Sequence, residues 1–234
     1  MTIVAENLKK INGCVMIPAY NEEKHLGRVI QAAKEFLPVI VVDDGSVDNT
    51  EQISREAGAI VFKQIPNQGK GAALQRGFQE CLAMGYDFVI TLDADGQHNP
   101  NEITHFIESF LINKSDLIIG FRDFSKMPLI RKLANKIGGW LFSWAIRIPI
   151  KDNQSGYRLL SKELVTKVLG INELGFEYEV EMIVRCVKSG LKIGWVPIQT
   201  IYADETSHIQ PFQHFMNFMR VVISTRKRMG NPEN

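Results

Sequence analysis

The sequence predicts an α/β fold with a mostly parallel central sheet that is flanked by helices. Short apolar runs alternate with amphipathic stretches over residues 13–121, a pattern typical of strand–helix–strand units with right-handed crossovers. Two of the runs end in paired acids followed by glycine, at 43–45 and 93–96. Because ligands bind beyond the carboxyl ends of parallel strands, we expect both acidic turns at one edge of the sheet, beside a ligand.

The first half of the chain contains five predicted strands, at residues 13–18, 39–42, 59–64, 88–92 and 116–121. The predicted helices between them cover the residues from Asn21 to Pro38 and the ranges 48–57, 72–84 and 101–111. Asn21 is a suitable N-cap, because two acidic residues follow it in what would be the first helical turn. Gly58 is expected to stop the second helix.

The second half is less regular. A basic stretch at 122–136 precedes an aromatic helix predicted at 137–150, which contains Trp140 and Trp144. This helix either packs in the core or presents a surface to membrane headgroups or an anionic acceptor. A strand at 157–160, a helix at 177–189, an edge strand or bent strand pair within 192–201 and a basic helical tail from Gln213 complete the prediction.

Composition narrows the class of protein. The chain has 234 residues, 45% hydrophobic and 23% charged, as expected for one globular domain. Its net charge of +1 argues against a nucleic-acid-binding protein. The three cysteines are far apart and form no metal-binding spacing, so we expect reduced core residues in a cytoplasmic protein. We expect no signal peptide and no membrane-spanning helix.

The second acidic turn, Asp93-Ala94-Asp95-Gly96-Gln97, is the strongest sign of chemistry. Two carboxylates one residue apart, with no cation nearby in sequence, favour a divalent cation between them. Mg²⁺ or Mn²⁺ with oxygen ligands, holding the phosphates of a nucleotide diphosphate, is the first hypothesis. The alternative is an acidic turn in which Asp95 accepts hydrogen bonds from nearby backbone amides.

A glycine-flanked lysine at Asn67-Gln68-Gly69-Lys70-Gly71 opens the predicted helix at 72–84. It is not a P-loop, because Gly71 stands where that motif has Ser or Thr. No G-x-G-x-x-G dinucleotide fingerprint is present in the chain.

Six segments in this order resemble a family 2 glycosyltransferase with the GT-A fold, of the dolichol-phosphate mannosyltransferase-like subgroup. Any one segment is weak evidence for the family. The full set is strong evidence, because the segments come in the family's order and cover nearly the whole chain. The segments are Pro18-Ala19-Tyr20-Asn21-Glu22, Val42-Asp43-Asp44-Gly45-Ser46, 67–71, 93–97, Gly120-Phe121-Arg122 and Ser155-Gly156-Tyr157-Arg158.

The resemblance implies one glycosyltransferase domain over 1–234: a nucleotide-sugar-binding half at about 12–121, an acceptor half at about 122–210 and an amphipathic basic helix at 211–234. It implies that Asp93, Asp95 and Gln97 hold the metal. It implies that Arg122 and Arg131 contact the acceptor phosphate. The catalytic residues that it implies are Asp95, Arg122 and Arg131. The residues implied to bind the nucleotide sugar are Pro18, Ala19, Tyr20, Glu22, Asp44, Lys70, Asp93 and Ala94.

The implied reaction is an inverting transfer of a sugar from a nucleotide sugar, with a polyprenyl phosphate as the candidate acceptor. A phosphate acceptor is already a nucleophile, whereas a hydroxyl acceptor would need a base such as Glu179, Glu181 or Asp152. Arg158 is a further candidate site residue. The subgroup's basic segment after Val-Pro-Ile differs here, and His208 stands in place of its lysine. His208 is a candidate contact to the diphosphate or metal.

Two alternatives remain open from sequence. A nucleotidyltransferase that makes nucleotide sugars would carry a glycine-rich basic loop after the first strand, where this chain has Ala19-Tyr20-Asn21-Glu22. A non-catalytic nucleotide-sugar-binding module would keep the pocket without turnover. The basic, amphipathic tail is also compatible with peripheral contact at the inner face of a membrane.

Overall fold

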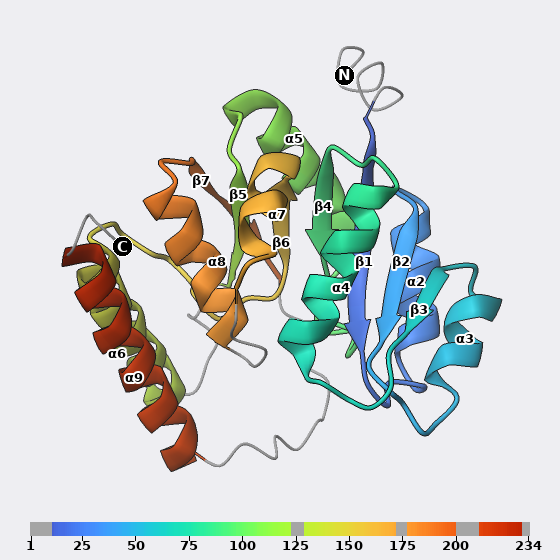
Figure 1. The fold of residues 1–234 in the computed structure, drawn as a ribbon, viewed down its shortest axis with the longest axis horizontal. Helices are drawn as coiled ribbons and strands as arrows, with labels where there is room; N and C mark the ends of the chain where they lie inside the picture. Colours follow the sequence, from blue (N-terminus) through green and yellow to red (C-terminus); the bar gives the residue numbers. More distant parts are fainter. Residues whose placement is uncertain (1–10, 123–128, 172–176, 200–210, 231–234) are drawn as a thin grey trace.

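The computed structural model describes residues 11–122, 129–171, 177–199 and 211–230, without the side chains of 129–136 and 211–218. One seven-stranded sheet crosses the molecule (Figure 1) in the order β3-β2-β1-β4-β6-β5-β7. The predicted α/β fold with a mostly parallel sheet is confirmed. The strands are β1 (Gly13–Ala19), β2 (Val39–Asp43), β3 (Ile60–Lys63), β4 (Phe88–Thr91), β5 (Leu117–Arg122), β6 (Arg158–Ser161) and β7 (Ile193–Ile198).

Strand β6 runs against the direction of the others. It pairs antiparallel with β4, where Thr91 lies opposite Arg158, and antiparallel with β5 on its other side. The remaining pairs, including β5 with β7, are parallel. The chain therefore leaves the sheet at Arg122 and returns to it at Arg158, after a long excursion that contains α6.

Helices cover both faces of the sheet. In Figure 1, α4, α7 and α8 lie in front of the strands, α2 and α5 lie behind them, and α6 and α9 form a pair at the end remote from β3. The helices are α2 (Leu26–Lys34), α3 (Thr50–Glu56), α4 (Lys70–Ala83), α5 (Ile103–Asn113, after a short 3-10 helix, Pro100–Glu102), α6 (Leu129–Ile146), α7 (Lys162–Val168), α8 (Glu177–Lys188) and α9 (Pro211–Gly230).

Strand β1 shows why two helical layers are needed. All seven of its residues are buried, because alternate side chains point to opposite faces of the sheet and both faces are covered. Cys14 and Met16 pack in the core under α4, whereas Val15 and Ile17 pack in the core under α2.

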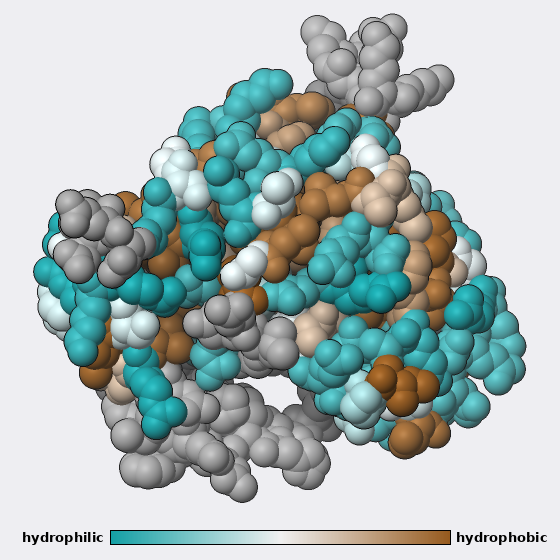
Figure 2. All heavy atoms as spheres, viewed as in Figure 1, coloured by the Kyte–Doolittle hydropathy of each residue, from teal (hydrophilic) through white to brown (hydrophobic). Residues whose placement is uncertain are grey.

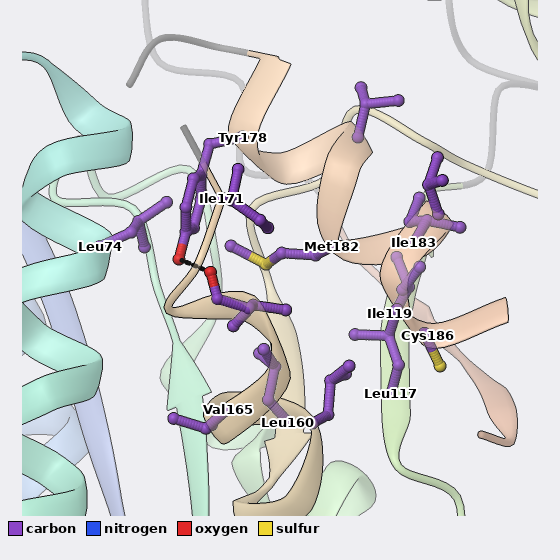
Figure 3. Packing of buried hydrophobic residues seen from close by; sticks show 14 of the residues in the cluster. Leu74, Leu117, Ile119, Leu160, Val165, Ile171, Tyr178, Met182, Ile183 and Cys186 are labelled. Carbon is purple, nitrogen blue, oxygen red and sulfur yellow. Dashed lines mark hydrogen bonds between the residues drawn. The ribbon is translucent and has the colours of Figure 1, made fainter. Parts of the chain in front are cut away.

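Helices α7 and α8 pack on the same face of the sheet as α4 and share one hydrophobic core with it. Figure 3 shows Leu117 and Leu160 of the sheet beneath Tyr178 and Met182 of α8. The buried Tyr178 hydroxyl donates to the carbonyl of Val168 at 3.1 Å, so its polar group is satisfied inside an apolar layer. This packing fixes α8 relative to the sheet.

Two sequence predictions need correction, the starts of the first helix and of α6; one helix was missed, and one alternative that the sequence left open is settled. The first helix begins at Leu26, not beside Asn21, because Asn21 has a left-handed φ of 56° and its side chain accepts from the Val47 amide. Helix α7 was not predicted, since it follows β6 without a loop. Segment 192–201 contributes one edge strand. Helix α6 begins at Leu129 and so includes part of the basic stretch.

Candidate active site

A pocket of about 510 Å³ opens at the carboxyl ends of β1, β2 and β4, the lower edge of the sheet in Figure 1. The two acidic turns meet there, as the sequence predicted, because parallel neighbouring strands end at the same edge. The pocket is lined by Pro18, Ala19, Tyr20, Glu22, Asp44, Asn67, Gly69, Lys70, Ala73, Asp93, Ala94 and Asp95. It includes every residue expected to bind the nucleotide sugar.

Asp44 organises one wall of this pocket. Its buried carboxylate accepts hydrogen bonds from the amides of Gln68, at 2.9 Å, and Gly69, at 2.7 Å, and from the side chain of Gln64. These bonds hold the loop that leads into α4, and Gly69 enters that helix with φ 94°, a conformation that favours glycine. Asp44 therefore shapes the pocket through the loop as well as lining it.

The segment after β1 is fixed by the turn after β2. The Asn21 amide donates to the Ser46 hydroxyl at 2.9 Å, and the Glu22 amide donates to the Thr50 hydroxyl at 2.8 Å. These contacts hold the positive φ of Asn21 and leave the Tyr20 ring half-exposed at the pocket. An exposed aromatic ring at a pocket rim offers a surface for a planar base.

Lys70 connects the pocket to α8. Its ammonium lies 2.6 Å from an Asp93 carboxylate oxygen and 3.2 Å from the buried Glu179 carboxylate. Burial alone would lower the pKa of Lys70, but the two carboxylates outweigh that effect and raise it. Burial would raise the pKa of Asp93, but Lys70, together with His98 and Arg158, lowers that pKa to about 2. The lysine is charged and Asp93 is ionised at neutral pH.

The turn after β4 presents Asp95 beside Asp93. An Asp95 oxygen accepts from the Gln97 amide at 2.9 Å, which is the local bond that the acidic-turn alternative requires. His98 packs beneath the turn, with a ring nitrogen 3.8 Å from Asp93 and its ring against Tyr157. Within the described residues, no group of three or more His, Cys, Asp and Glu side chains is arranged as a metal site. Gln97 does not line the pocket.

Gly156 and Arg158 support Asp93 from behind. A Cβ on Gly156 would lie 2.5 Å from an Asp93 carboxylate oxygen, so only glycine fits beside that side chain. Arg158 is fully buried and donates to the carbonyls of Asn153, Ser155 and Glu179. It ties the loop before β6 to α8. Arg158 does not line the pocket. It holds the neighbouring loop and helix in position.

Arg122 stands at the end of β5 and is held by one carboxylate. Its guanidinium donates to both oxygens of the buried Asp152, at 2.8 and 3.1 Å. A two-pronged pair of this kind fixes the plane of the guanidinium. The side chain of Arg131 and the whole of His208 lie outside the described residues, so their predicted roles stay predictions.

The three carboxylates considered as bases for a hydroxyl acceptor are each close to a cation. Glu179 faces Lys70, Asp152 faces Arg122, and Glu181 accepts from Arg228 of α9 at 2.6 Å. All three are buried. Sequence reasoning quoted Gly156 only as part of a motif and did not anticipate its approach to Asp93, and nothing in the sequence marks Gln64 as a partner of Asp44.

Comparison with known proteins identifies the family of this chain. The family model described as "Glycosyl transferase family 2" matches residues 14–166. The UDP-N-acetylglucosamine–dolichyl-phosphate N-acetylglucosaminyltransferase of Methanococcus voltae is 32% identical over 81% of this chain and 86% of its own length. The polyprenol monophosphomannose synthase of Mycolicibacterium smegmatis is 29% identical over 79% of this chain and 75% of its own.

Among solved structures, glucosyl-3-phosphoglycerate synthase of Mycobacterium tuberculosis, in a complex with Mn²⁺, UDP-glucose and phosphoglyceric acid, superposes with a TM-score of 0.74. It is 21% identical and covers 99% of this chain and 84% of its own length, so it supports the GT-A fold. In the described part of the chain, no helix is long and apolar enough to cross a membrane. The chain belongs to glycosyltransferase family 2, in its dolichol-phosphate mannosyltransferase-like subgroup.

Proposed function

We propose that this glycosyltransferase moves a sugar, with inversion, from a nucleoside-diphosphate sugar to a polyprenyl phosphate. The observation that carries the proposal is the pocket in which Asp44, Lys70, Asp93 and Asp95 meet at one edge of the sheet. A pocket of about 510 Å³ has the size of a small-molecule site. The names of the relatives, which mention dolichyl phosphate and polyprenol monophosphomannose, support the acceptor class.

We expect the base and the diphosphate to contact different residues of the pocket. Tyr20, Glu22 and Asp44, which line it, would bind the base and ribose. Lys70 is the first residue of α4, and the N-terminus of a helix carries partial positive charge. The Lys70 ammonium and this helix end together would bind the phosphate oxygens of the leaving nucleoside diphosphate and stabilise their growing negative charge.

The residues present fit a divalent cation. Asp93 and Asp95 supply two carboxylates, which are ligands that Mg²⁺ and Mn²⁺ accept, and the remaining positions of such a shell are commonly water and substrate phosphate. The lack of a third acidic or histidine ligand among the described residues suits an ion that is completed by the donor. When bound, the ion would act as a Lewis acid on the diphosphate. Gln97 is the third ligand that the family resemblance implies.

The acceptor side favours a phosphate. Arg122, fixed by Asp152, supplies a planar donor that matches a phosphate. The candidate bases Glu179, Glu181 and Asp152 each face a cation, so their carboxylate oxygens are already engaged in ion pairs. An acceptor that is already an anionic nucleophile needs no such base. Arg131 follows Arg122 along the chain, and it is proposed as a second contact to the acceptor phosphate.

The donor can be ranked by thermal shift. Ligands that bind the native state raise the melting temperature according to their concentration relative to Kd. UDP-, GDP- and dTDP-sugars are compared, each with Mn²⁺, with Mg²⁺ and with EDTA. We expect one nucleotide class to stabilise the protein, and more so with the cation. The stabilising donor is then tested for transfer to a short-chain polyprenyl phosphate, with the product identified by mass.

Asp93→Ala and Asp95→Ala test the metal site. We expect each to lower transfer about a thousandfold, as loss of a main electrostatic element does. Asp87→Ala is the matched control, because this exposed acid stands at the opposite end of β4. Unchanged transfer in both pocket variants would refute the metal role. Release of pyrophosphate would indicate a nucleotidyltransferase, and donor binding without any turnover would indicate a binding module.

A further inference from the structure

The ion pair between Lys70 and Asp93 lies in the pocket wall and joins two residues that the proposed function uses separately. The Lys70 ammonium is 2.6 Å from Oδ1 of Asp93, whereas the proposed function gives Asp93 to a divalent cation and Lys70 to the donor phosphates. Two cations at one carboxylate repel each other. The ion pair therefore opposes the binding of a cation at Asp93.

Glu179 is a second partner for the same ammonium. Its carboxylate lies 3.2 Å from the Lys70 ammonium, and its side chain is only 4% exposed, against 26% for Asp93. Glu179 does not line the pocket. It stands in the first turn of α8, where a negative charge is stabilised by the helix end, and Arg158 donates to its carbonyl. A lysine that left Asp93 would therefore keep one carboxylate partner.

The backbone of Lys70 is fixed, while its side chain can turn. The amide of the preceding Gly69 donates to Asp44 at 2.7 Å, which anchors the start of α4. The Lys70 side chain is 37% exposed, and a four-carbon stem lets its ammonium move between neighbouring acceptors. The Asp93 carboxylate is confined, because a Cβ on Gly156 would lie 2.5 Å from it. Movement at this pair therefore belongs to Lys70.

The surroundings of the pair suit an exchange of charged partners. In Figure 2 the described surface around the start of α4 is mostly hydrophilic. Donor phosphates that enter the pocket beside it would bring several anionic oxygens close to the Lys70 ammonium, and charge-assisted hydrogen bonds to such oxygens are strong. Phosphate can therefore compete with Asp93 for the lysine.

We propose that Lys70 exchanges Asp93 for the donor phosphates and so couples the binding of the donor to the binding of the metal. Before the donor binds, the ammonium holds Asp93. When the phosphates enter, the ammonium moves to them and keeps Glu179, and Asp93 becomes available to the divalent cation. Glu179 is a positioning residue, because it acts through Lys70. The inference rests on the proposed function and deepens it.

A purely structural ion pair is the alternative. Such a pair would only link α4 to α8 and to the turn after β4, and loss of Lys70 would leave Asp93 poorly placed to bind a cation. In the proposed exchange, loss of Lys70 removes a competitor, so a cation binds Asp93 more tightly. The sign of the change in metal affinity distinguishes the two.

The test is the binding of Mn²⁺ alone to the full chain, followed by the electron paramagnetic resonance signal of free Mn²⁺. Lys70→Gln removes the charge and keeps a hydrogen-bond donor. We expect this variant to bind Mn²⁺ at least about tenfold more tightly than the wild type, because one adjacent charge changes the affinity of a carboxylate for a cation by about that factor. Lys70→Arg keeps the charge and should bind Mn²⁺ as weakly as the wild type.

Lys63→Gln is the matched control for net charge. Lys63 ends β3 at the same edge of the sheet, 3.7 Å from an Asp43 oxygen, and it does not line the pocket. Its charge is further from the cation and is screened by salt. The Mn²⁺ affinity of this variant should stay within about twofold of that of the wild type.

UDP and GDP are the probes of the coupling itself. The nucleotide that binds should tighten Mn²⁺ binding by the wild type, and Mn²⁺ should strengthen nucleotide binding by the same factor. This factor should be smaller in Lys70→Gln, because the variant has no competitor left to release. An equal factor in the two proteins would overturn the coupling.

Glu179→Gln tests the positioning role. Lys70 then loses one partner and holds Asp93 more firmly, so Mn²⁺ alone should bind about tenfold more weakly, the effect of roughly one charge-assisted hydrogen bond. In a double variant with Lys70→Gln, the same change should have less effect, because Glu179 acts through the lysine. An equal effect in both backgrounds would show direct action on the cation and overturn the positioning role.

The remaining outcomes separate the inference from the proposed function. Unchanged or weaker Mn²⁺ binding by Lys70→Gln would overturn the inference, and normal transfer by the wild type would then leave the function standing. Mn²⁺ should raise the melting temperature of Lys70→Gln more than that of the wild type, so a variant that stays unfolded in excess Mn²⁺ would also overturn the inference. Absence of Mn²⁺ binding by the wild type with either nucleotide would refute the metal role itself.

Discussion

The first half of the chain, residues 11–121, and the second half, residues 122–230, use buried charge in different ways. In the first half, Asp44 and Asp93 stand at the ends of parallel strands and line the pocket. In the second half, Arg158 and the Arg122–Asp152 pair connect loops and helices around that pocket. The difference teaches that the acidic motifs of the parallel half place side chains in the pocket wall, while motifs of the second half hold the surrounding loops and helices in position.

Loss of the support should have the largest effect on stability. Arg158→Ala removes a buried guanidinium and leaves three backbone carbonyls without their donor. We expect the free energy of unfolding to fall by about 3 kcal/mol or more, measured by urea denaturation. Arg55→Ala, at an exposed position with a surface partner on α3, should cost less than about 0.5 kcal/mol. Equal losses would show that burial of Arg158 contributes nothing.

Gly156→Ala should affect catalysis more than folding. The added methyl group would lie 2.5 Å from an Asp93 oxygen and must displace that carboxylate. Because misplacement of about 1 Å can cost a hundredfold in rate, we expect kcat/KM to fall about a hundredfold. Gly170→Ala is the control, since its Cβ would meet no atom within 4 Å. Activity equal to that of the control would show that the pocket adapts freely around Asp93.

Asp152→Asn should weaken the binding of the acceptor and leave the binding of the donor unchanged. The change removes the negative charge that holds Arg122, so the guanidinium loses its fixed plane. We expect the KM for the polyprenyl phosphate to rise about tenfold, the cost of roughly one charge-assisted hydrogen bond. Thermal stabilisation by the donor should not change. Asp116→Asn, at the opposite end of β5 with two hydrogen-bond partners of its own, should leave the acceptor KM unaltered.

The smallest effect is expected for surface ion pairs at the edge of the first half. Lys63 and Arg55 hold the pKa of Glu51 below its ordinary value of 4.5. Its contribution to stability is therefore full above that value and is lost as the pH falls through the lower pKa of the folded state. Glu51→Gln should cost about 0.5 kcal/mol at pH 7 and nothing in strong acid. Both effects are measured by urea denaturation, with Glu108→Gln, at an exposed position on α5, as the control for the loss of one surface carboxylate.

The sequence predicted the first half well because three of its parallel strands, β1, β2 and β4, are buried on both faces. A strand buried in this way reads as a continuous apolar run, and β1, β2 and β4 were found within a residue or two. The acidic turns follow directly from where those runs end. The first helix was placed too early, since the bond from the Val47 amide to Asn21 joins residues far apart in sequence and leaves no local signal.

The second half was harder to predict because its order depends on contacts between distant residues. Nothing local shows that β6 runs antiparallel between β4 and β5, or that Arg158 points inward to carbonyls instead of outward to a ligand. The aromatic helix left two interpretations open. Packing in the core is confirmed for one side of α6, whereas the other side is exposed and its contact with membrane headgroups or an anionic acceptor stays a prediction.

The excursion between β5 and β6 bears on how such enzymes diverge. Because β6 lies between β4 and β5, the excursion starts and ends at neighbouring strands of one sheet. A chimera could carry a longer, shorter or differently charged excursion as long as it kept an inner apolar side, the acid that holds Arg122 and the glycine beside Asp93. Acceptor preference could then be inherited separately from donor preference, within a single chain.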